Sequence, residues 1–342
     1  AITTQPTAQS VCSGATLQLT VTGVGAGVTY QWFKDNVAVP NSNNDTLTIT
    51  NAQTTNAGVY KVTLTGSCGT VTSQNVTVNV SGQNTWLGAV SSDWNTAANW
   101  CGSIPTQTSD IVIPAGTPFQ PSVNALAEVR NITVNAGASL TILSNGFLNI
   151  YGNYQNTGTL NAQTGFIGFK GTTIKTANTI NASTVVINGT GGVSLTGDWT
   201  VGTLILENGN VRVNASALTL TNSSTGSAGS HILTNGVGSV RAQNVTSTRI
   251  VAVGADSLSY NPVTINNGQG RDYTVRVAVG IQPAITQSAR AINRTWTVLP
   301  SSAVTTPVEL TFQWADAHGN ASVTAGGDME VGVNSNAPGG IW

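Results

Sequence analysis

Two carboxylates, Asp198 and Glu207, are the only acidic side chains between residues 129 and 250. Two carboxylates on one face of a protein can hydrolyse a glycosidic bond, and clustered acids with a base can bind calcium and cleave an acidic polysaccharide by proton abstraction. These two acids are nine residues apart. In a short-strand repeat of about 20 residues they would lie on different faces. The sequence therefore predicts no paired-carboxylate site.

Other catalytic chemistries lack their residues as well. The two histidines, His231 and His318, lie far apart, and no His, Cys, Asp or Glu cluster has metal-ligand spacing. No serine lies in a G-x-S-x-G turn, and no glycine-rich phosphate loop precedes a helix. We expect no catalytic residue, no metal and no cofactor, so the chain is predicted not to be an enzyme.

Tryptophan is concentrated in one segment, in which Trp86, Trp94 and Trp100 fall within fifteen residues and Cys101 follows directly. Indole faces stack on sugars, so these three are candidate glycan-binding residues. They could instead close the end of a strand repeat, which otherwise exposes apolar core and unpaired strand groups. We favour such a cap over residues 83–106. Cys101 is expected to be a buried thiol, with a bridge to another chain as the alternative.

Composition predicts an all-β extracellular protein. Charged residues make up 7% of the 342 residues, and the polar remainder is rich in Thr, Asn, Ser and Gly. The net charge is −1 without any Lys/Arg run, which argues against nucleic-acid partners. No apolar stretch approaches the ~20 residues of a membrane span. Low charge and a single expected disulfide are typical of secreted or cell-surface proteins.

A short repeat runs through residues 107–250. Apolar residues recur in i, i+2 pairs between Asn-Gly and Thr-Gly turns, at Ile132/Val134, Leu140/Ile142, Leu148/Ile150, Ile167/Phe169, Val193/Leu195, Leu204/Leu206, Val211/Val213 and Leu218/Leu220. Equivalent stations at Ile132, Tyr154, Ile174, Val193 and Val211 are 22, 20, 19 and 18 residues apart. This period predicts a right-handed parallel β-helix of about five to six coils over residues 83–250, cap included. An irregular β-sandwich is the alternative.

Residues 1–82 contain short alternating runs that are typical of a β-sandwich. Trp32 in "YQWFKDN" and the stretch Asn56 to Tyr60 resemble the core tryptophan and the tyrosine corner of immunoglobulin-like domains. Leu19 and Val62 stand where that family has its two inter-sheet cysteines.

Two cysteines of this region lie elsewhere, at Cys12 and Cys68. This displaced pair resembles the Ig-like modules of large surface proteins of the Bacteroidetes, and the resemblance implies a Cys12–Cys68 disulfide. Two buried free thiols are the alternative.

Longer alternating runs in residues 251–342 predict an antiparallel β-sandwich: "NPVTINN", "YTVRVAVG", "AINRTWTVLP" and "PVELTFQW". The chain stops at "GGIW", so we expect this sandwich to be truncated at Trp342, with the missing strand supplied by further chain or by a neighbouring molecule. This region and the run W-x-G-x-x-x-x-D-W-x-x-x-x-N-W-C at 86–101 also resemble the same surface proteins.

The resemblance implies export by the Bacteroidetes outer-membrane (type IX) secretion route. We expect a non-catalytic structural segment of an extracellular surface protein, such as a stalk, filament element or adhesin repeat, whose partners are neighbouring domains or copies of itself. The alternatives are a carbohydrate-binding module for cell-surface or environmental polysaccharide and, third, a β-helix lyase or hydrolase. Asp-(Ser/Thr)-apolar tripeptides, O-glycosylated in such proteins, make Thr46 and Ser257 candidate glycosylation sites.

Overall fold

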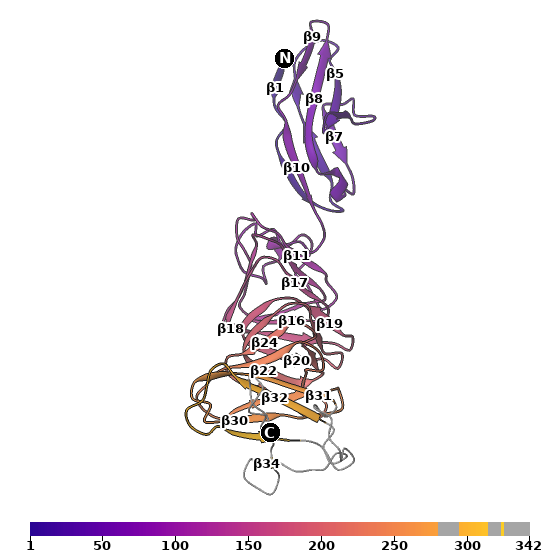
Figure 1. Ribbon diagram of the computed structural model, residues 1–342. Helices are drawn as coiled ribbons and strands as arrows, with labels where there is room; N and C mark the ends of the chain where they lie inside the picture. The colour runs from indigo at the N-terminus through magenta and orange to yellow at the C-terminus, as the bar shows by residue number, and fades with distance from the viewer. Residues whose placement is uncertain (280–293, 314–322, 325–342) are drawn as a thin grey trace. The chain divides into compact units, whose positions relative to one another are not determined.

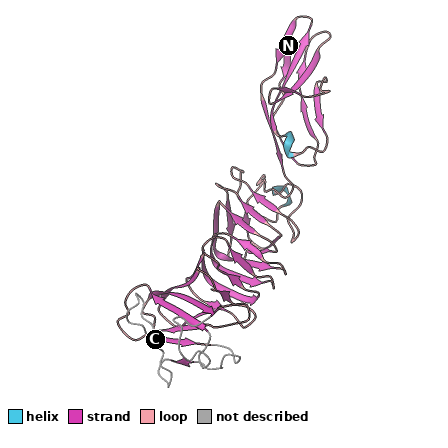
Figure 2. Cartoon of the chain, turned by 45° about the vertical axis from the view of Figure 1, so that its right-hand side comes forward, coloured by secondary structure: helices cyan, strands magenta, loops and turns pink. Residues whose placement is uncertain are grey.

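The computed structural model describes residues 1–279, 294–313 and 323–324. The chain divides into two compact units, coloured along the chain in Figure 1. The Ig unit holds Ala1–Leu87 and Ala97–Ser103, and the solenoid unit holds Gly88–Thr96 and Ile104–Trp342. The predicted third domain, residues 251–342, is grouped with the solenoid in one unit. Within the described residues the only helices are two 3-10 turns, η1 (Thr54–Asn56) and η2 (Ala97–Asn99) (Figure 2).

The Ig unit is a β-sandwich of ten strands: β1 (Ile2–Thr4), β2 (Gln9–Cys12), β3 (Leu17–Thr20), β4 (Thr22–Gly23), β5 (Thr29–Lys34), β6 (Val37–Ala38), β7 (Thr46–Ile49), β8 (Gly58–Gly66), β9 (Gly69–Thr72) and β10 (Val76–Ser81). One sheet has the order β2-β10-β8-β5-β6, with β9 also paired to β8. The opposite layer is formed by the pairs β1–β4 and β3–β7. This arrangement confirms the predicted Ig-like fold.

The core of the Ig unit follows the sequence pattern. Trp32 is fully buried, and its indole N–H donates to the Asn44 carbonyl at 3.0 Å. The Tyr60 hydroxyl donates to the Asn56 carbonyl at 2.8 Å, which confirms the tyrosine corner. Leu19 and Val62 are 1% and 0% exposed, so apolar packing fills the space that an inter-sheet disulfide would occupy.

The solenoid unit is a parallel β-helix of about seven turns. Its first face stacks eight strands in chain order: β11 (Ile111–Ile113), β14 (Ile132–Val134), β17 (Tyr154–Asn156), β19 (Lys175–Ala177), β21 (Val193–Leu195), β23 (Val211–Arg212), β26 (Ile232–Leu233) and β29 (Val253–Gly254). Every neighbouring pair on this face is parallel. Each coil therefore hydrogen-bonds to the coils before and after it.

The second face stacks β12 (Ser122–Val123), β15 (Ser139–Ile142), β18 (Thr159–Lys170), β20 (Ile180–Asn188), β22 (Trp199–Asn208), β24 (Ala217–Leu220) and β27 (Ser239–Val245). The third face begins with β13 (Leu126–Val129) and β16 (Phe147–Ile150) and ends with β25 (Ser224–Thr225). Between these ends, β18, β20 and β22 are long enough to bend from the second face onto the third.

The predicted apolar pairs point inward. All eight pairs are buried, with no member more than 5% exposed. The prediction that Ile174 is the inward residue of its coil is wrong, because this residue is 56% exposed in a turn. Lys175 takes the inward position, and its ammonium donates to the carbonyls of Gly171 at 3.1 Å and Thr173 at 2.6 Å. Burial lowers the pKa of Lys175.

The predicted number of coils, about five to six, is too low. The first-face strands of the late coils, β23, β26 and β29, are two residues long. Such strands leave too little alternation in the sequence for a period to be recognised. The right-handed sense of the helix stays a prediction.

Antiparallel strands follow the last coil. β31 (Arg271–Val279) and β32 (Arg294–Pro300) extend the second face beyond β27, and a separate sheet contains β28 (Arg249–Val251), β30 (Val263–Asn266), β33 (Glu309–Phe312) and β34 (Val323–Thr324). The rings of Trp296 and Phe312 connect the two layers, with centroids 5.4 Å apart. These strands agree with the predicted sandwich, but its proposed open end at Trp342 lies outside the described residues.

Candidate functional site: the junction segment and a polar hollow

The tryptophan segment is divided between the two units. Trp86 and Trp100 belong to the Ig unit, where they form an antiparallel bridge and an edge-to-face pair with ring centroids 4.9 Å apart. Trp94 belongs to the solenoid unit, where its backbone N–H donates to the carbonyl of Ser122, on β12 of the first coil, at 3.1 Å. Of the three tryptophans, only Trp94 therefore lies against the first coil, where the predicted cap would place all three.

Burial excludes these tryptophans from sugar stacking. Trp86, Trp94 and Trp100 are 0%, 0% and 3% exposed. A pyranose ring has to lie on an open indole face, and none of the three presents one. The assignment of these residues as candidate glycan-binding residues is therefore wrong, and their area serves to bury apolar surface instead.

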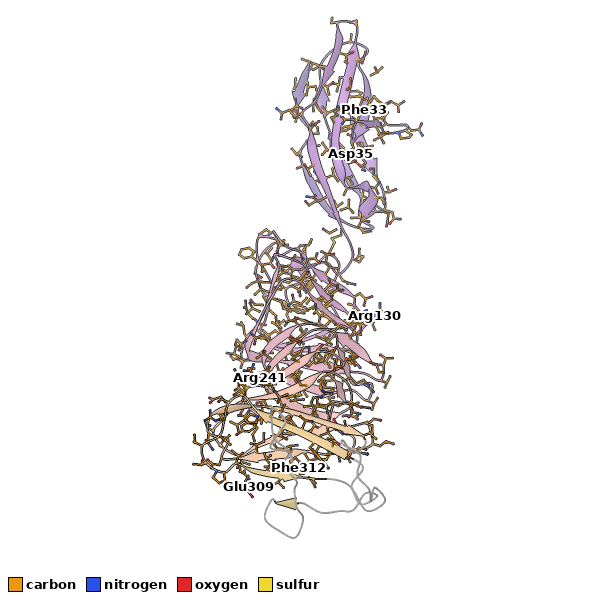
Figure 3. The ribbon with its side chains drawn as sticks, viewed as in Figure 1. Phe33, Asp35, Arg130, Arg241, Glu309 and Phe312 are labelled. Atoms are coloured by element: carbon orange, nitrogen blue, oxygen red, sulfur yellow. A yellow bond between two sulfur atoms is a disulfide. The ribbon has the colours of Figure 1, made fainter. Side chains whose placement is uncertain are left out.

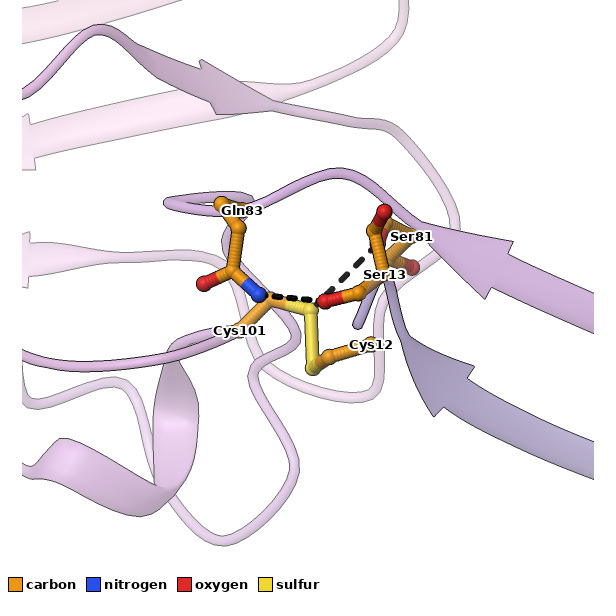
Figure 4. The surroundings of a disulfide bond; sticks show 5 residues. All are labelled: Cys12, Ser13, Ser81, Gln83 and Cys101. Carbon is orange, nitrogen blue, oxygen red and sulfur yellow. Dashed lines mark hydrogen bonds between the residues drawn. A yellow bond between two sulfur atoms is a disulfide. The ribbon is translucent and has the colours of Figure 1, made fainter. Parts of the chain in front are cut away.

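A disulfide joins Cys12 to Cys101, with the two Cα atoms 5.5 Å apart (Figure 4). Residues 84–87 and 99–101 form a short ladder beside it, in which the Asn84 N–H donates to the Cys101 carbonyl and the Cys101 N–H to the Thr85 carbonyl, both at 2.8 Å. The Gln83 side chain also donates to the Ser13 carbonyl. The segment carrying Cys101 is thus fixed to the Ig unit by covalent and hydrogen bonds.

The predicted Cys12–Cys68 bridge is wrong. Cys68 is a free, exposed cysteine in the turn between β8 and β9. Cys12 ends β2, which pairs in parallel with β10 so that Cys12 lies opposite Ser81. The chain therefore leaves β10 beside Cys12, and the segment that returns after η2 brings Cys101 to it. Cys101 is buried as expected, but it is bonded rather than free.

The two candidate glycosylation sites differ in accessibility. Thr46 is half-buried on β7, and its hydroxyl shares a hydrogen bond of 3.3 Å with Thr20. Ser257 is exposed in a turn beside Leu258, which is 87% exposed. Glycosylation of either residue stays a prediction, for which Ser257 offers the more open hydroxyl.

Catalytic groups do not converge in the described residues. No three His, Cys, Asp or Glu side chains there could hold a metal ion. Asp198 precedes β22 and accepts from the Ala217 N–H at 2.8 Å, whereas Glu207 lies near the far end of β22 and accepts from the Asn188 amide. The strand bends between them, so the two acids lie on different faces. His318 is outside the described residues.

His231 is a structural residue at the last coils. It is fully buried, and its two ring nitrogens lie 3.1 Å from the Ser227 carbonyl oxygen and 2.8 Å from that of Asp256. Both nitrogens therefore face main-chain acceptors, and neither is available to act as a base towards a substrate.

A polar hollow lies on the outer surface of the Ig unit. It has a volume of about 310 Å³ and is lined by Asp35, Asn36, Val59, Lys61 and Asn75. The Ig unit has only four charged side chains. Two of them, Asp35 and Lys61, line the hollow, and Lys34 pairs with Asp35 at 2.9 Å. Three of the four charged side chains of this unit thus lie at one place, near Asp35 and Phe33 in Figure 3.

The side chains of the hollow are fixed by local geometry. Asp35 and Asn36 form the two-residue turn between β5 and β6, with φ values of 49° and 67°, a conformation that Asp and Asn tolerate. The Val59 N–H donates to the Asp35 carboxylate at 2.9 Å, and this bond, with Lys34, lowers the pKa of Asp35. The Lys61 ammonium donates to the Asn36 side chain at 2.7 Å and lies 6.0 Å from the centroid of the Phe33 ring.

Sequence reasoning missed this hollow, because three separate stretches of chain contribute to it. The only local signal was "KDN" between two strands, which is typical of a tight hairpin turn.

No helix among the described residues is long and apolar enough to cross a membrane. An Ig-like domain and a disulfide are both typical of extracellular proteins.

Comparison with known families divides the chain in a similar way. Residues 1–80 match the family described as Immunoglobulin I-set domain. Residues 85–201 match a family described only as Domain of unknown function (DUF8693). No curated protein matches the chain.

Similar solved structures include the N-terminal Ig1-2 module of the Drosophila receptor protein tyrosine phosphatase DLAR, with 25% identity and a TM-score of 0.22 over 23% of this chain and 44% of that one. Titin M4 has 20% identity and a TM-score of 0.22, covering 24% of this chain and 94% of its own. Immunoglobulin domains 1–5 of Sidekick-1 have 18% identity and a TM-score of 0.23, covering 27% and 20%. The similarity to each is limited to about a quarter of this chain.

Proposed function

We propose that this chain is a non-catalytic structural segment of an extracellular protein, a stalk, filament element or adhesin repeat that carries tension along its length. The I-set match and the disulfide support an extracellular setting. The observation that carries the proposal is the position of the Cys12–Cys101 bond in the chain.

Tension in a polypeptide follows its covalent bonds. A pull on the N-terminal end passes along residues 1–12, crosses the disulfide and continues from Cys101 into the solenoid unit. Residues 13–100, which include β3 to β10, lie outside this path. The strands β3 to β10 are therefore not extended by the load, and the pairs of β1 with β4 and of β2 with β10 are the parts of the sandwich that bear it.

The rest of the path runs through the solenoid. Each coil is joined to the next by parallel ladders, on all three faces in the middle coils and on fewer at the last ones, and the apolar residues that point inward are buried. In a repeat of this kind every coil is stabilised by its neighbours, which suits a spacer that holds its length.

The resemblance of the sequence to Bacteroidetes surface proteins supports a finer proposal. The chain would be exported by the type IX route, and its partners would be neighbouring domains or copies of the same protein. The second candidate function is carbohydrate binding. The polar hollow on the Ig unit supports it, whereas the buried tryptophans do not. No residue cluster in the described part of the chain supports a lyase or hydrolase.

Single-molecule stretching of the chain, held at its first and last residues, tests the proposal. With the disulfide intact, unfolding should release no length from residues 13–100. Reduction should add about 300 Å of extension, since the bond spans 89 residues at about 3.3–3.6 Å each. Cys101→Ser should behave like the reduced protein under all conditions. Equal extension with and without reductant would contradict the proposed load path.

A further inference from the structure

We propose that the polar hollow of the Ig unit binds an uncharged, hydroxyl-rich ligand, namely a neutral oligosaccharide. The inference rests on the proposed function and deepens it, because it names what an adhesive extracellular segment would hold. The proposed carbohydrate site is therefore not the tryptophan segment but the sheet that contains β5, β8 and β10.

The hollow has hydrogen-bonding capacity left over. The Asp35 side chain is 52% exposed, and each carboxylate oxygen accepts one bond, from the Val59 N–H or from Lys34. Each oxygen keeps a further lone pair. Lys61 donates one of its three protons to Asn36. Asn75 is exposed, and its amide makes no hydrogen bond within the described residues.

These groups match the needs of neighbouring hydroxyls. A hydroxyl both donates and accepts, so a diol needs acceptors and donors side by side. Asp35 accepts, Lys61 donates and the Asn75 amide does both. Val59, 41% exposed, supplies an apolar edge for the C–H groups of a sugar ring. The volume of about 310 Å³ is at the lower end of small-ligand sites, which span roughly 300–1,000 Å³.

The charges favour a neutral ligand over an ionic one. The hollow is lined by one carboxylate, that of Asp35, and one ammonium group, that of Lys61, so the charges of its lining cancel. The Asp35 carboxylate would repel an anionic polymer, and the Lys61 ammonium would repel a cation. Hydroxyls can bond to both without bringing a charge.

The site is formed before any ligand arrives. Lys61 is held between Asn36 and the Phe33 ring, and Asp35 is held by Val59. Side chains that are already ordered lose little freedom on binding, which favours even a small contact.

Binding of the oxidised chain to immobilised oligosaccharides tests the inference. The neutral probes are the hexasaccharides of cellulose, xylan, mannan, laminarin and starch, and the charged probes are polygalacturonate and chitosan. We expect binding to at least one neutral probe, weakened about tenfold or more in Asn75→Ala and in Asp35→Asn, since each loses a hydrogen bond to the ligand. Asp35→Asn keeps an acceptor for the Val59 N–H, so the turn should remain folded. Asn43→Ala, an exposed asparagine that does not line the hollow, is the matched control.

Three results would overturn the inference: no binding to any neutral probe, binding only to a charged probe, or equal binding by Asn75→Ala and the unaltered chain. None of these would change the extension measured under tension. Failure of the sugar site and failure of the load path are therefore distinguishable.

Discussion

Cys12 and Cys101 are bonded across 89 residues of chain, although Cys68 is the nearer cysteine to Cys12 in sequence. The bond lies where the chain leaves β10 opposite Cys12 and returns after η2. It closes a covalent loop of chain that includes the strands β3 to β10. We expect this one connection to stabilise the Ig unit and, under the proposed function, to keep β3 to β10 off the load path.

Loss of the disulfide should destabilise the Ig unit. Closing a loop of this length is worth up to about 4–5 kcal/mol by loop entropy, so Cys101→Ser should lower the free energy of unfolding of this unit by about 2–5 kcal/mol. Hydrogen exchange of peptides from β5 and β8 measures the unit separately from the solenoid. Cys68→Ser, at an exposed free thiol, should change it by less than about 0.5 kcal/mol. A larger effect of Cys68→Ser would contradict the assignment.

The tyrosine corner should contribute through its hydroxyl. Tyr60→Phe keeps the ring but removes the bond to the Asn56 carbonyl, which should cost about 1 kcal/mol in unfolding free energy. Tyr30→Phe is the control, because the Tyr30 hydroxyl makes no hydrogen bond within the described residues. Urea unfolding of both variants measures the difference, and equal midpoints would show that the corner is not stabilising.

Close packing between neighbouring coils should make the stability of the solenoid sensitive to replacement of Gly191. A Cβ at position 191 would lie 1.9 Å from the Thr173 carbonyl oxygen, whereas a Cβ at position 229 meets nothing within 4 Å. Gly191→Ala should therefore destabilise the solenoid by about 3 kcal/mol, and Gly229→Ala should leave it nearly unchanged. Thermal unfolding checks both. A wild-type midpoint for Gly191→Ala would mean that adjacent coils are further apart than described.

The solenoid unit should lose stability in acid. The Asn244 N–H and then the Arg241 guanidinium lower the pKa of Asp272 from its ordinary value of 3.8. A lowered folded-state pKa adds stability above the unfolded-state value, and that stability is lost as the pH falls through the folded-state pKa. Unfolding free energy measured in urea should therefore fall below about pH 4, and less steeply in Asp272→Asn. Identical pH slopes for the two proteins would contradict this contribution.

Local patterns account for the parts of the fold that could be predicted. Pairs such as Leu140/Ile142 alternate within one strand, and the corner at Tyr60 lies four residues from its acceptor, so both are readable without knowledge of distant neighbours. Ile174 shows the limit of this reasoning. Its side chain is apolar, but the turn before β19 places it outside. Lys175 is buried because the carbonyls of that turn accept hydrogen bonds from its ammonium group.

The candidate sites depended on distant contacts and could not be predicted in the same way. The partner of Cys12 is decided by the parallel pairing of β2 with β10, which places Ser81 beside it. The polar hollow needs the turn at Asp35 to meet β8 and the start of β10. Composition gave no sign of either, because tryptophan-rich and cysteine-bearing segments fit both a binding platform and a buried junction.

Peptide mapping under non-reducing conditions is the most direct test of the covalent path. Free thiols are first alkylated in the folded chain, and the protein is then digested without reductant. The account predicts a linked pair of peptides containing Cys12 and Cys101, with the alkyl label on Cys68 alone. A linked Cys12–Cys68 pair, or an alkylated Cys101, would contradict it, because tension would then also pass through β9 and β10 of the Ig unit.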